Sequence, residues 1–208
     1  MSEYWESKFK NEGTLWKFEP ADSAIIALKI FKSAGIKKIL IPGIGYGRNA
    51  KLFYDEGFRI TGIEISQSAI RLAKENGMDF TIHHGSVNSM PFDNEQYDGI
   101  FCYALIHLLN NKERQIFLKS CFNQLKPCGL MIFTVVSKQY EMYGKGKLLS
   151  RDRFEITKGI NVYFYDPDSV KKEFAGFGLM QSNELDEPVK FMTGENPIKC
   201  IFVLCKKD

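Results

Sequence analysis

Residues 39–50 read ILIPGIGYGRNA, an apolar run followed by Gly43, Gly45 and Gly47 and then by a polar segment. The apolar run predicts a short buried strand, and residues 48–56 predict a helix. Glycine lets the backbone turn sharply and lets a ligand approach the chain closely. The first turn of the following helix presents unpaired N–H groups. The stretch therefore predicts a strand, a tight turn and a helix that together hold a ligand.

An acidic residue ends the next predicted strand. Residues 59–64 read RITGIE, so Glu64 follows Gly47 by 17 positions. In a strand–helix–strand unit this carboxylate lies beside the crevice at the glycine turn, where it can accept hydrogen bonds from both hydroxyls of a ribose. A plain tight turn with a surface glutamate is the simpler alternative. Three alternating glycines, however, cost chain entropy that such a turn does not require.

The glycine spacing discriminates between nucleotide-binding patterns. A dinucleotide fingerprint, GxGxxG, requires glycine at position 48, where this chain has Arg48. A phosphate-binding P-loop requires GxxxxGK followed by Ser or Thr, which residues 43–48 do not supply. The pattern GxGxG therefore disfavours both a dinucleotide-dependent oxidoreductase and a P-loop.

Strand-like and helix-like segments alternate along the chain, which predicts a mostly parallel sheet covered by helices. The helices are expected at 21–34, 48–56, 66–76, 111–125 and 168–174, and the strands at 38–42, 59–64, 79–83, 97–103, 130–136, 179–184 and 200–205. A Pro-Cys-Gly turn at 127–129 is expected to end the fourth helix. Residues 137–165 are rich in aromatic and charged side chains and show no clean period.

Composition and charge fit one globular domain spanning residues 1–208. Hydrophobic residues make up 44% of the chain, and the formal net charge is +3, which favours neither a nucleic-acid nor a membrane partner. There is no membrane-length apolar run and no apolar signal-peptide core, so we expect a cytoplasmic protein. The five cysteines form no CxxC pair, so we expect neither a disulfide framework nor a metal site. Cys102, Cys200 and Cys205 are expected to pack as small hydrophobes.

The stretch ILIPGIGYGRNAKLFYDEGFRITGIEISQSAI resembles the nucleotide-binding half of class I S-adenosylmethionine-dependent methyltransferases. Pro42 and the block GIEISQSAI resemble the thiopurine and thiol/halide methyltransferase group, and GRN at 47–49 is similar to tellurite-resistance methyltransferases. The resemblance covers roughly residues 36–136. It implies an α/β fold with a Rossmann-like, seven-stranded, mostly parallel sheet, helices on both faces and one reversed strand near the C-terminus. It also implies S-adenosylmethionine as cofactor and methyl transfer to a small molecule.

The same resemblance implies the cofactor-binding residues. The three glycines would wrap the methionine part, Glu64 would bind the ribose, and the segment after the strand 97–103 would face the substrate. Ser86 stands where many relatives have an Asp that binds the adenine amino group, so adenine contacts are expected from backbone groups and Val87. The expected cofactor-binding set is Trp16, Gly43, Ile44, Gly45, Gly47, Asn49, Glu64, Ile65, Ser86, Val87, Tyr103 and Ala104.

The chemistry needs few protein groups, because the cofactor carries the reactive methyl. His107 is the candidate general base, since it follows the strand 97–103 and an unperturbed histidine titrates near neutrality. A histidine that only hydrogen-bonds backbone or solvent is the alternative. The resemblance also implies that residues 1–20 form a cap and residues 137–165 a substrate lid, and we expect each to bring at least one aromatic side chain to the site.

Three alternatives remain open. The chain could bind the cofactor without catalysis, it could methylate RNA or protein, or it could be an oxidoreductase, which the glycine spacing disfavours. No Asn-Pro-Pro-Tyr-like motif, which would favour a nucleic-acid or protein acceptor, follows Tyr103. The sequence predicts neither the methyl acceptor nor the oligomeric state.

Overall fold

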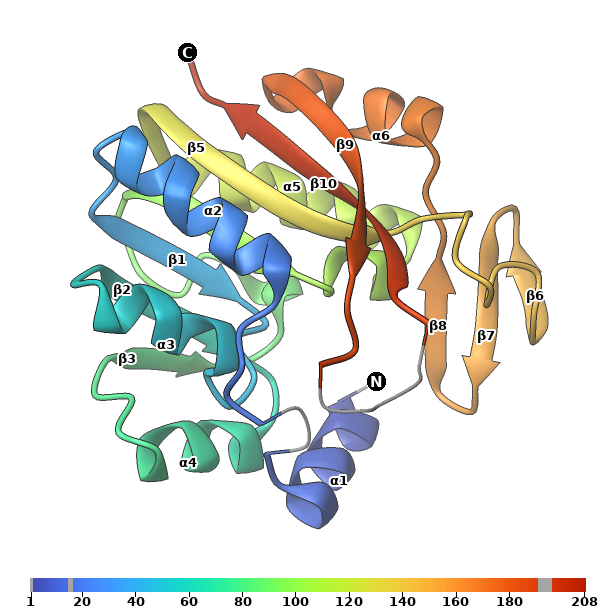
Figure 1. Ribbon diagram of the computed structural model, residues 1–208, viewed down its shortest axis with the longest axis horizontal. Helices are drawn as coiled ribbons and strands as arrows, with labels where there is room; N and C mark the ends of the chain where they lie inside the picture. The colour runs from blue at the N-terminus through green and yellow to red at the C-terminus, as the bar shows by residue number, and fades with distance from the viewer. Residues whose placement is uncertain (1, 15–16, 191–195) are drawn as a thin grey trace.

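The computed structural model of the protein describes residues 2–14, 17–190 and 196–208. A seven-stranded sheet forms the middle layer, with helices on both faces, as the sequence predicted (Figure 1). Its strands are β1 (Lys38–Pro42), β2 (Arg59–Glu64), β3 (Thr81–His84), β4 (Tyr97–Tyr103), β5 (Leu125–Val136), β9 (Leu179–Glu187) and β10 (Ile198–Lys206).

The strand order is β3-β2-β1-β4-β5-β10-β9, and β10 alone runs antiparallel to its neighbours. The predicted single reversed strand near the C-terminus is therefore confirmed. The chain moves outward from β1 to β3 and then returns to place β4 on the other side of β1. Such a reversal opens a crevice at the carboxyl ends of the two central strands. Ligand-binding segments are expected there.

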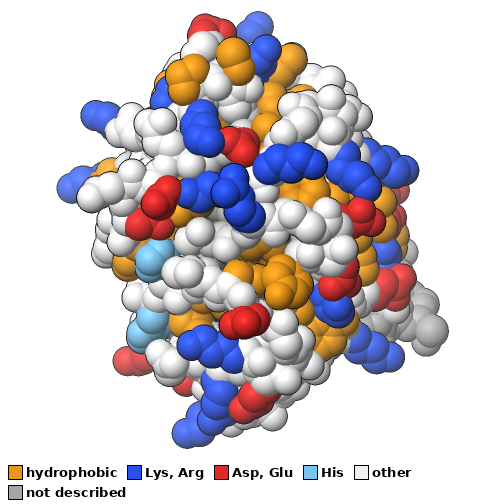
Figure 2. Space-filling model, turned by 90° about the vertical axis from the view of Figure 1, so that its left-hand side faces the viewer, with side chains coloured by type: hydrophobic (Ala, Val, Ile, Leu, Met, Phe, Trp, Pro, Cys, Tyr) orange, Lys and Arg blue, Asp and Glu red, His pale blue; other side chains and the backbone are white. Residues whose placement is uncertain are grey.

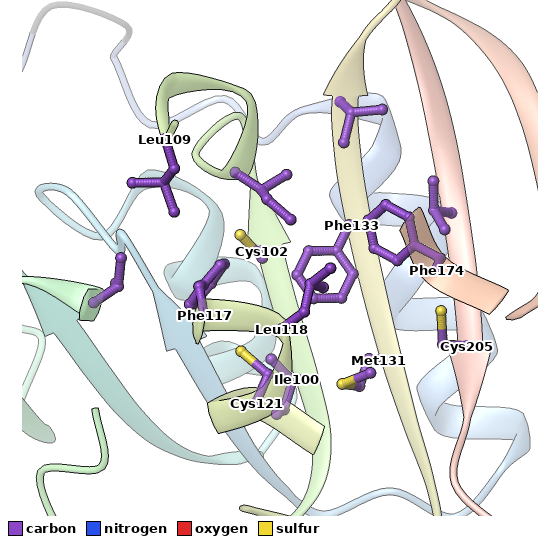
Figure 3. Packing of buried hydrophobic residues seen from close by; sticks show 14 of the residues in the cluster. Ile100, Cys102, Leu109, Phe117, Leu118, Cys121, Met131, Phe133, Phe174 and Cys205 are labelled. Carbon is purple, nitrogen blue, oxygen red and sulfur yellow. The ribbon is translucent and has the colours of Figure 1, made fainter. Parts of the chain in front are cut away.

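Two hydrophobic cores hold the helices on the sheet. On one face lie α2 (Asp22–Ser33) and α3 (Arg48–Asp55), and on the other lie α5 (Asn111–Gln124) and α6 (Pro167–Phe174). On the second face Phe117 of α5 and Phe174 of α6 both pack on Phe133 of β5, with ring centroids 6.2 and 5.3 Å away (Figure 3). Cys102 and Cys121 fill this core as small hydrophobes.

Local capping signals set several helix boundaries. The Ser66 hydroxyl accepts the Ala69 N–H at the start of α4 (Gln67–Glu75), where the sequence predicted an N-cap. Asn110 and Glu113 form a reciprocal capping box at the start of α5. The helix α5 ends at Gln124, within one residue of the predicted end, but the predicted Pro-Cys-Gly turn after it is wrong, because β5 begins at once. Residues 127–129 lie inside that strand because Cys128 N and Gly129 O both bond the backbone of Lys207.

The sequence pattern missed two further parts of the fold. Residues 137–165, which show no period, contain a separate antiparallel sheet of β6 (Lys147–Ser150), β7 (Arg153–Thr157) and β8 (Ile160–Tyr163). These strands are only four to five residues long, and β6 and β7 show no alternation of burial; only β8 alternates, over four residues, which is too short to be distinctive. The N-terminal segment contains a helix, α1 (Ser2–Glu12), which packs against α4.

The end of β9 caps the start of α2. Ala21, at the N-cap of α2, makes no side-chain cap, and the N–H groups of Asp22 and Ser23 instead donate to the Glu187 carboxylate at 2.6 and 3.1 Å. Glu187 is 2% exposed. A buried carboxylate thus supplies the acceptor that the helix start requires. The contact ties the edge of the sheet to the helix layer beside the crevice.

The surface of the molecule mixes charged and hydrophobic side chains. Basic and acidic side chains are interspersed on the face in Figure 2, with hydrophobic side chains between them. Across the described part of the chain, no helix is long and apolar enough to span a bilayer. All five cysteines are free, and only Cys128 is exposed.

Candidate active site

The glycine turn follows β1 and adopts a backbone that only glycine enters without strain. Gly43, Gly45 and Gly47 have φ angles of 68°, 59° and 87°. The N–H groups of Gly43 and Ile44 donate to the Ile63 carbonyl at 2.8 and 3.1 Å, which joins the turn to β2. The turn is therefore part of the sheet edge and presents a fixed surface to the crevice.

The three glycines of the turn have different roles. A Cβ on Gly43 would lie 3.0 Å from Leu105 Cδ2, across the crevice. A Cβ on Gly47 would lie 3.0 Å from Met78 Cγ, on the side of α4. Gly47 is absent from the cavity lining, whereas Gly43 and Gly45 are present. Gly47 is the N-cap residue of α3 and lets the chain enter that helix, and its contact with the cofactor stays a prediction.

Glu64 ends β2 as a buried carboxylate that is 5% exposed. It accepts three backbone N–H groups, from Gly45 at 2.8 Å, Ile65 at 2.8 Å and Ser66 at 2.9 Å. Burial raises the pKa of the Glu64 carboxyl, while the three backbone donors oppose that rise. The side chain thus organises the glycine turn as well as facing the crevice.

A cavity of about 280 Å³ occupies the crevice at the ends of β1, β2 and β4. It contains most of the residues that the sequence assigned to the cofactor. Those that line it are Gly43, Ile44, Gly45, Asn49, Glu64, Ile65, Ser86, Val87, Tyr103 and Ala104. Trp16 lies outside the described residues.

Two of these residues also hold neighbouring segments. The Ser86 hydroxyl accepts the Asn88 N–H at 3.2 Å and caps the turn η1 (Val87–Ser89). The Asn49 side-chain oxygen accepts the Ala21 N–H at 3.0 Å and so holds the approach to α2. Their contacts to a ligand stay predictions, whereas their contacts within the protein are part of the fold.

The end of β4 forms the opposite wall. Ala104 has a φ of 51°, a left-handed conformation that is costly for a residue with a Cβ. After it, the chain turns through η2 (Ile106–Leu108), and Leu105, Leu108 and Leu109 line the cavity. Burial raises the pKa of the Tyr103 phenol well above its ordinary value. This wall is apolar and has no group that titrates near neutrality.

The structure does not bring His107 to the cavity. Its neighbours Leu105 and Leu108 line the cavity, but His107 is 5% exposed and is not among the lining residues. Burial lowers the pKa of His107 to about 3. In the described part of the chain its Nδ1 has no hydrogen-bond partner. The short turn after β4 points this side chain into the protein, which the sequence did not indicate.

The N-terminal helix covers one side of the cavity. Trp5 and Phe9 of α1 line the cavity and stack on each other with ring centroids 5.9 Å apart. Tyr46, the residue between Gly45 and Gly47, packs on Phe9 and donates its hydroxyl to the Lys17 carbonyl at 2.6 Å. The glycine turn therefore anchors the cap directly, a role that the sequence pattern did not assign to Tyr46.

The Glu6 carboxylate joins α1 to α4 through hydrogen bonds with Ser66 and Ser68, a contact that we call the clasp. Glu6 accepts the hydroxyls of Ser68 and Ser66 at 2.6 and 2.7 Å and the Ser68 N–H at 3.1 Å. These bonds, led by the Ser68 and Ser66 hydroxyls, lower the pKa of Glu6 to about 2. Because the folded-state pKa is depressed, the clasp is complete at neutral pH and is lost as the pH falls from about 4.5 towards 2.

We expect Glu6→Ala to loosen the N-terminal cap without unfolding the domain. Hydrogen–deuterium exchange of residues 2–12 should accelerate at pH 7, and the affinity for an adenosine ligand should fall about two- to tenfold, since a net hydrogen bond to a charged group contributes roughly 1.5–3 kcal/mol and this site is partly exposed. Glu3→Ala, an exposed change on the same helix, is the control. Equal exchange rates in both variants would contradict the clasp.

The aromatic residues of the segment 137–165 do not reach this cavity. Of the residues that the structure describes, the lining includes none of Tyr140, Tyr143, Phe154, Tyr163, Phe164 and Tyr165. Phe164 is buried in a small cluster beside Leu108, and Tyr4 and Trp5 of α1 pack against the same cluster. The small sheet therefore supports the cavity wall from behind, and an aromatic contact between this segment and a substrate stays a prediction.

Comparison with known proteins shows what this chain is similar to. Residues 39–129 match the family described as a methyltransferase domain. The "Putative methyltransferase GWCH70_2453" of Geobacillus sp. is 31% identical over 64% of this chain and 56% of its own. The tRNA N(3)-methylcytidine methyltransferase Mettl2 of Drosophila melanogaster is 24% identical over 77% and 52%, and thiocyanate methyltransferase 1 of Brassica oleracea is 26% identical over 62% and 59%. The chain spans about half the length of the curated relatives it matches.

Solved structures share the fold at low identity. The Burkholderia thailandensis 1,6-didemethyltoxoflavin-N1-methyltransferase, solved with S-adenosylhomocysteine, has a TM-score of 0.75 and 16% identity over 99% of this chain and 86% of its own. TehB from Haemophilus influenzae has a TM-score of 0.70 and 16% identity over 98% and 67%. The match of residues 39–129 to a methyltransferase domain and the shared fold agree with the resemblance seen in the sequence.

S-adenosylmethionine is the cofactor that the resemblance implies, and the cavity fits it. Gly43 and Gly45 form a cradle that side chains would narrow, since a Cβ on Gly43 would meet Leu105 at 3.0 Å. Glu64 places a buried acceptor beside that cradle. A carboxylate with free lone pairs at a glycine turn is the arrangement that ribose hydroxyls require.

Proposed function

We propose that this chain is an S-adenosylmethionine-dependent methyltransferase that acts on a small molecule. The observation that carries the proposal is the cavity at the reversal of strand order, where the glycine turn, Glu64 and the end of β4 meet. Its volume of about 280 Å³ lies near the lower end of the range for small-molecule sites. When bound, the cofactor supplies an electrophilic methyl group on a sulfonium sulfur.

The chain's own residues contribute binding, alignment and exclusion of water. Glu64 and the glycine turn would fix the nucleoside part, which sets the direction from which an acceptor attacks. Leu105, Leu108 and Leu109 give the acceptor side an apolar wall. Holding two reactants in line is worth up to about 7–11 kcal/mol of the barrier. We propose that residues 1–20 cap this site and that residues 137–165 form its substrate lid. Both segments belong to one domain.

The acceptor in this proposal already carries a reactive lone pair. Among the described residues at the end of β4, Tyr103 holds its proton strongly and His107 lies outside the cavity. An acceptor such as a thiolate or another soft anion needs no base from the protein. The similarity to a thiocyanate methyltransferase supports this choice. The similarity to a tRNA methyltransferase favours an RNA acceptor as the second candidate.

We expect His107→Leu to leave the rate of methyl transfer within about threefold of the wild type, because the imidazole does not face the cavity. Loss of a general base would instead reduce the rate by about 10²–10⁴. Removing an unpartnered buried nitrogen is also expected to preserve or raise the melting temperature. The test compares kcat and its pH profile for both proteins with one acceptor. A hundredfold loss of kcat in a folded variant would restore His107 as the base.

The proposed function is tested by calorimetric titration with S-adenosylmethionine and with S-adenosylhomocysteine. Micromolar binding of both supports the cofactor site, and no binding of either refutes the proposal. Transfer of a labelled methyl group is then screened with thiols, thiopurines and metalloid anions, with bulk tRNA as a parallel arm. Turnover with a thiol or a metalloid anion supports the small-molecule class, turnover with tRNA alone supports the second candidate, and tight binding with no turnover supports a non-catalytic protein.

A further inference from the structure

The described residues of the connection between β9 and β10 line part of the cavity. Pro188 and Val189 directly follow Glu187, the last residue of β9. Ile198 is the first residue of β10, lines the same cavity and is paired with Glu187 across the two strands. The three lining side chains are apolar, so these residues present a hydrophobic surface to a ligand.

This connection approaches the cavity from the far side of β4. In the sheet, β1, β4 and β5 lie between β10 and β2, the strand that ends at Glu64 (Figure 1). Glu64 is the residue expected to bind the ribose of the cofactor. The surface at residues 188–189 and 198 therefore faces the part of the cavity that is left for the second reactant, next to the leucines that follow β4.

Two charged side chains fasten this connection to the start of α2. Glu187, which is buried, accepts the first two N–H groups of α2 at 2.6 and 3.1 Å. Lys190 donates to the Pro20 carbonyl at 2.8 Å and pairs with the Asp22 carboxylate at 2.7 Å, and its side chain is only 17% exposed. Charged hydrogen bonds are strong where water is largely excluded. The two lining residues between these attachment points are therefore held in place at both ends.

The same helix start is bonded to the cofactor side of the cavity. Asn49 of α3, which lines the cavity, accepts the Ala21 N–H at 3.0 Å. Burial raises the pKa of the Tyr103 phenol, and the Glu187 carboxylate adds to that rise because a nearby negative charge disfavours the phenolate. Glu187 is therefore close to the end of β4. The start of α2 thus sets the position of the β9–β10 connection relative to α3 and β4.

We infer that Val189 contacts the methyl acceptor and that Glu187 and Lys190 position this contact by fastening the β9–β10 connection to the start of α2. The assignment rests on the proposed function, which gives the cavity its two reactants. It narrows the acceptor to a molecule with an apolar body, such as an aromatic or aliphatic thiol, because burial of apolar surface against Val189 favours binding. Glu187 and Lys190 act through the main chain that they hold, so they are positioning residues.

The experiment compares the wild type with Val189→Thr, Lys190→Met and Lys199→Met. Thr keeps the branched shape of Val189 but adds a hydroxyl to the apolar surface. Met replaces the Lys190 side chain by an unbranched apolar one and removes the charge. Lys199→Met is the matched control, because Lys199 of β10 pairs with Asp186 of β9 on the exposed surface of the same two strands.

The probes are S-adenosylhomocysteine and thioanisole. Transfer of a methyl group from S-adenosylmethionine to the sulfur of thiophenolate gives these two molecules, so they are the products of one reaction. Calorimetry measures the binding of each probe alone and of thioanisole to protein loaded with S-adenosylhomocysteine. Initial rates with thiophenol give kcat and KM. Hydrogen–deuterium exchange of residues 20–24 reports the attachment to α2.

Thioanisole should bind both Val189→Thr and Lys190→Met about three- to tenfold more weakly than the wild type, with S-adenosylhomocysteine unchanged within about twofold. In Val189→Thr the KM for thiophenol should rise by the same factor while kcat stays within about twofold, as expected for a contact made equally before and during transfer. In Lys190→Met the exchange of residues 20–24 should accelerate. The control should match the wild type in every measurement.

Unchanged thioanisole binding in Val189→Thr would overturn the contact, and unchanged exchange and binding in Lys190→Met would overturn the positioning role. Equal losses for both probes would show a purely structural role and would also overturn it. If the wild type binds S-adenosylhomocysteine but not thioanisole, the acceptor contact fails while the proposed function stands. If it binds thioanisole but no nucleoside, the proposed function fails, and the same comparison on ligand-free protein decides the role of the connection. Binding of neither probe would refute both.

Discussion

Replacing Glu64 by alanine is expected to weaken the binding of S-adenosylhomocysteine roughly 5- to 150-fold, which corresponds to about 1–3 kcal/mol for loss of a charged hydrogen-bonding partner. The reason is twofold. The carboxylate faces the cavity as the acceptor expected for the ribose, and it also holds the N–H groups of Gly45, Ile65 and Ser66. Loss of the side chain therefore removes a ligand contact and frees the turn that shapes the cradle.

Calorimetry on a folded variant measures this effect, with Glu75→Ala, an exposed change on α4, as the matched control. A fall in the melting temperature measured without ligand reports the lost hydrogen bonds of the turn. The lost ribose contact affects only the binding of the ligand. Glu64→Gln keeps the volume and one acceptor oxygen, and its binding is expected to lie between those of the wild type and Glu64→Ala. Wild-type affinity in a folded Glu64→Ala protein would contradict the assignment of Glu64 to the ribose hydroxyls.

The pH dependence of binding gives an independent check on the same group. Burial raises the pKa of Glu64, and only the charged carboxylate offers acceptors on both oxygens. Cofactor binding should therefore weaken as the pH falls through this raised pKa. The Glu64→Ala protein lacks the group, so this part of its pH dependence should disappear.

The second large effect is expected from Gly178→Ala, which should lower the free energy of unfolding by about 3–5 kcal/mol. Gly178 has a φ of +71°, and an added Cβ would lie 1.8 Å from the Lys206 carbonyl oxygen. Lys206 N donates to the Gly178 carbonyl at 2.8 Å, so the two backbones are held together at the start of β9. Relief of the contact requires β9 and β10 to separate at that end.

Thermal unfolding measures this effect, and the expected loss is on the order of 10 °C for a chain of this length. Gly57→Ala is the matched control, because its φ is +79° but no atom lies within 4 Å of the added Cβ. In that variant the free energy of unfolding should fall only by the cost of the left-handed backbone, about 1–2 kcal/mol. Equal losses in both variants would show that the backbone conformation alone accounts for the effect and that the contact with Lys206 does not contribute.

The sheet and the main parts of the cavity could be predicted from the sequence because their signals are local. The run 39–42 is apolar without interruption, the glycines at 43 and 45 follow it directly, and Glu64 ends the next strand. Each signal lies within a few residues of the element that it predicts. Parallel pairing of the two strands then brings the carboxylate beside the turn.

The rest of the site depends on contacts between residues that are far apart in the chain. Glu6 reaches Ser68, Glu187 reaches the start of α2, and Arg48 lies over Tyr103. Spacing within a segment carries no information about such pairs, because each partner is an ordinary polar or aromatic residue in its own local sequence. His107 shows the same limit: its position after β4 predicted a place at the cavity, but the turn at 106–108 buries it. Local patterns thus define the strands and the glycine turn, whereas packing between elements defines which side chains face the ligand.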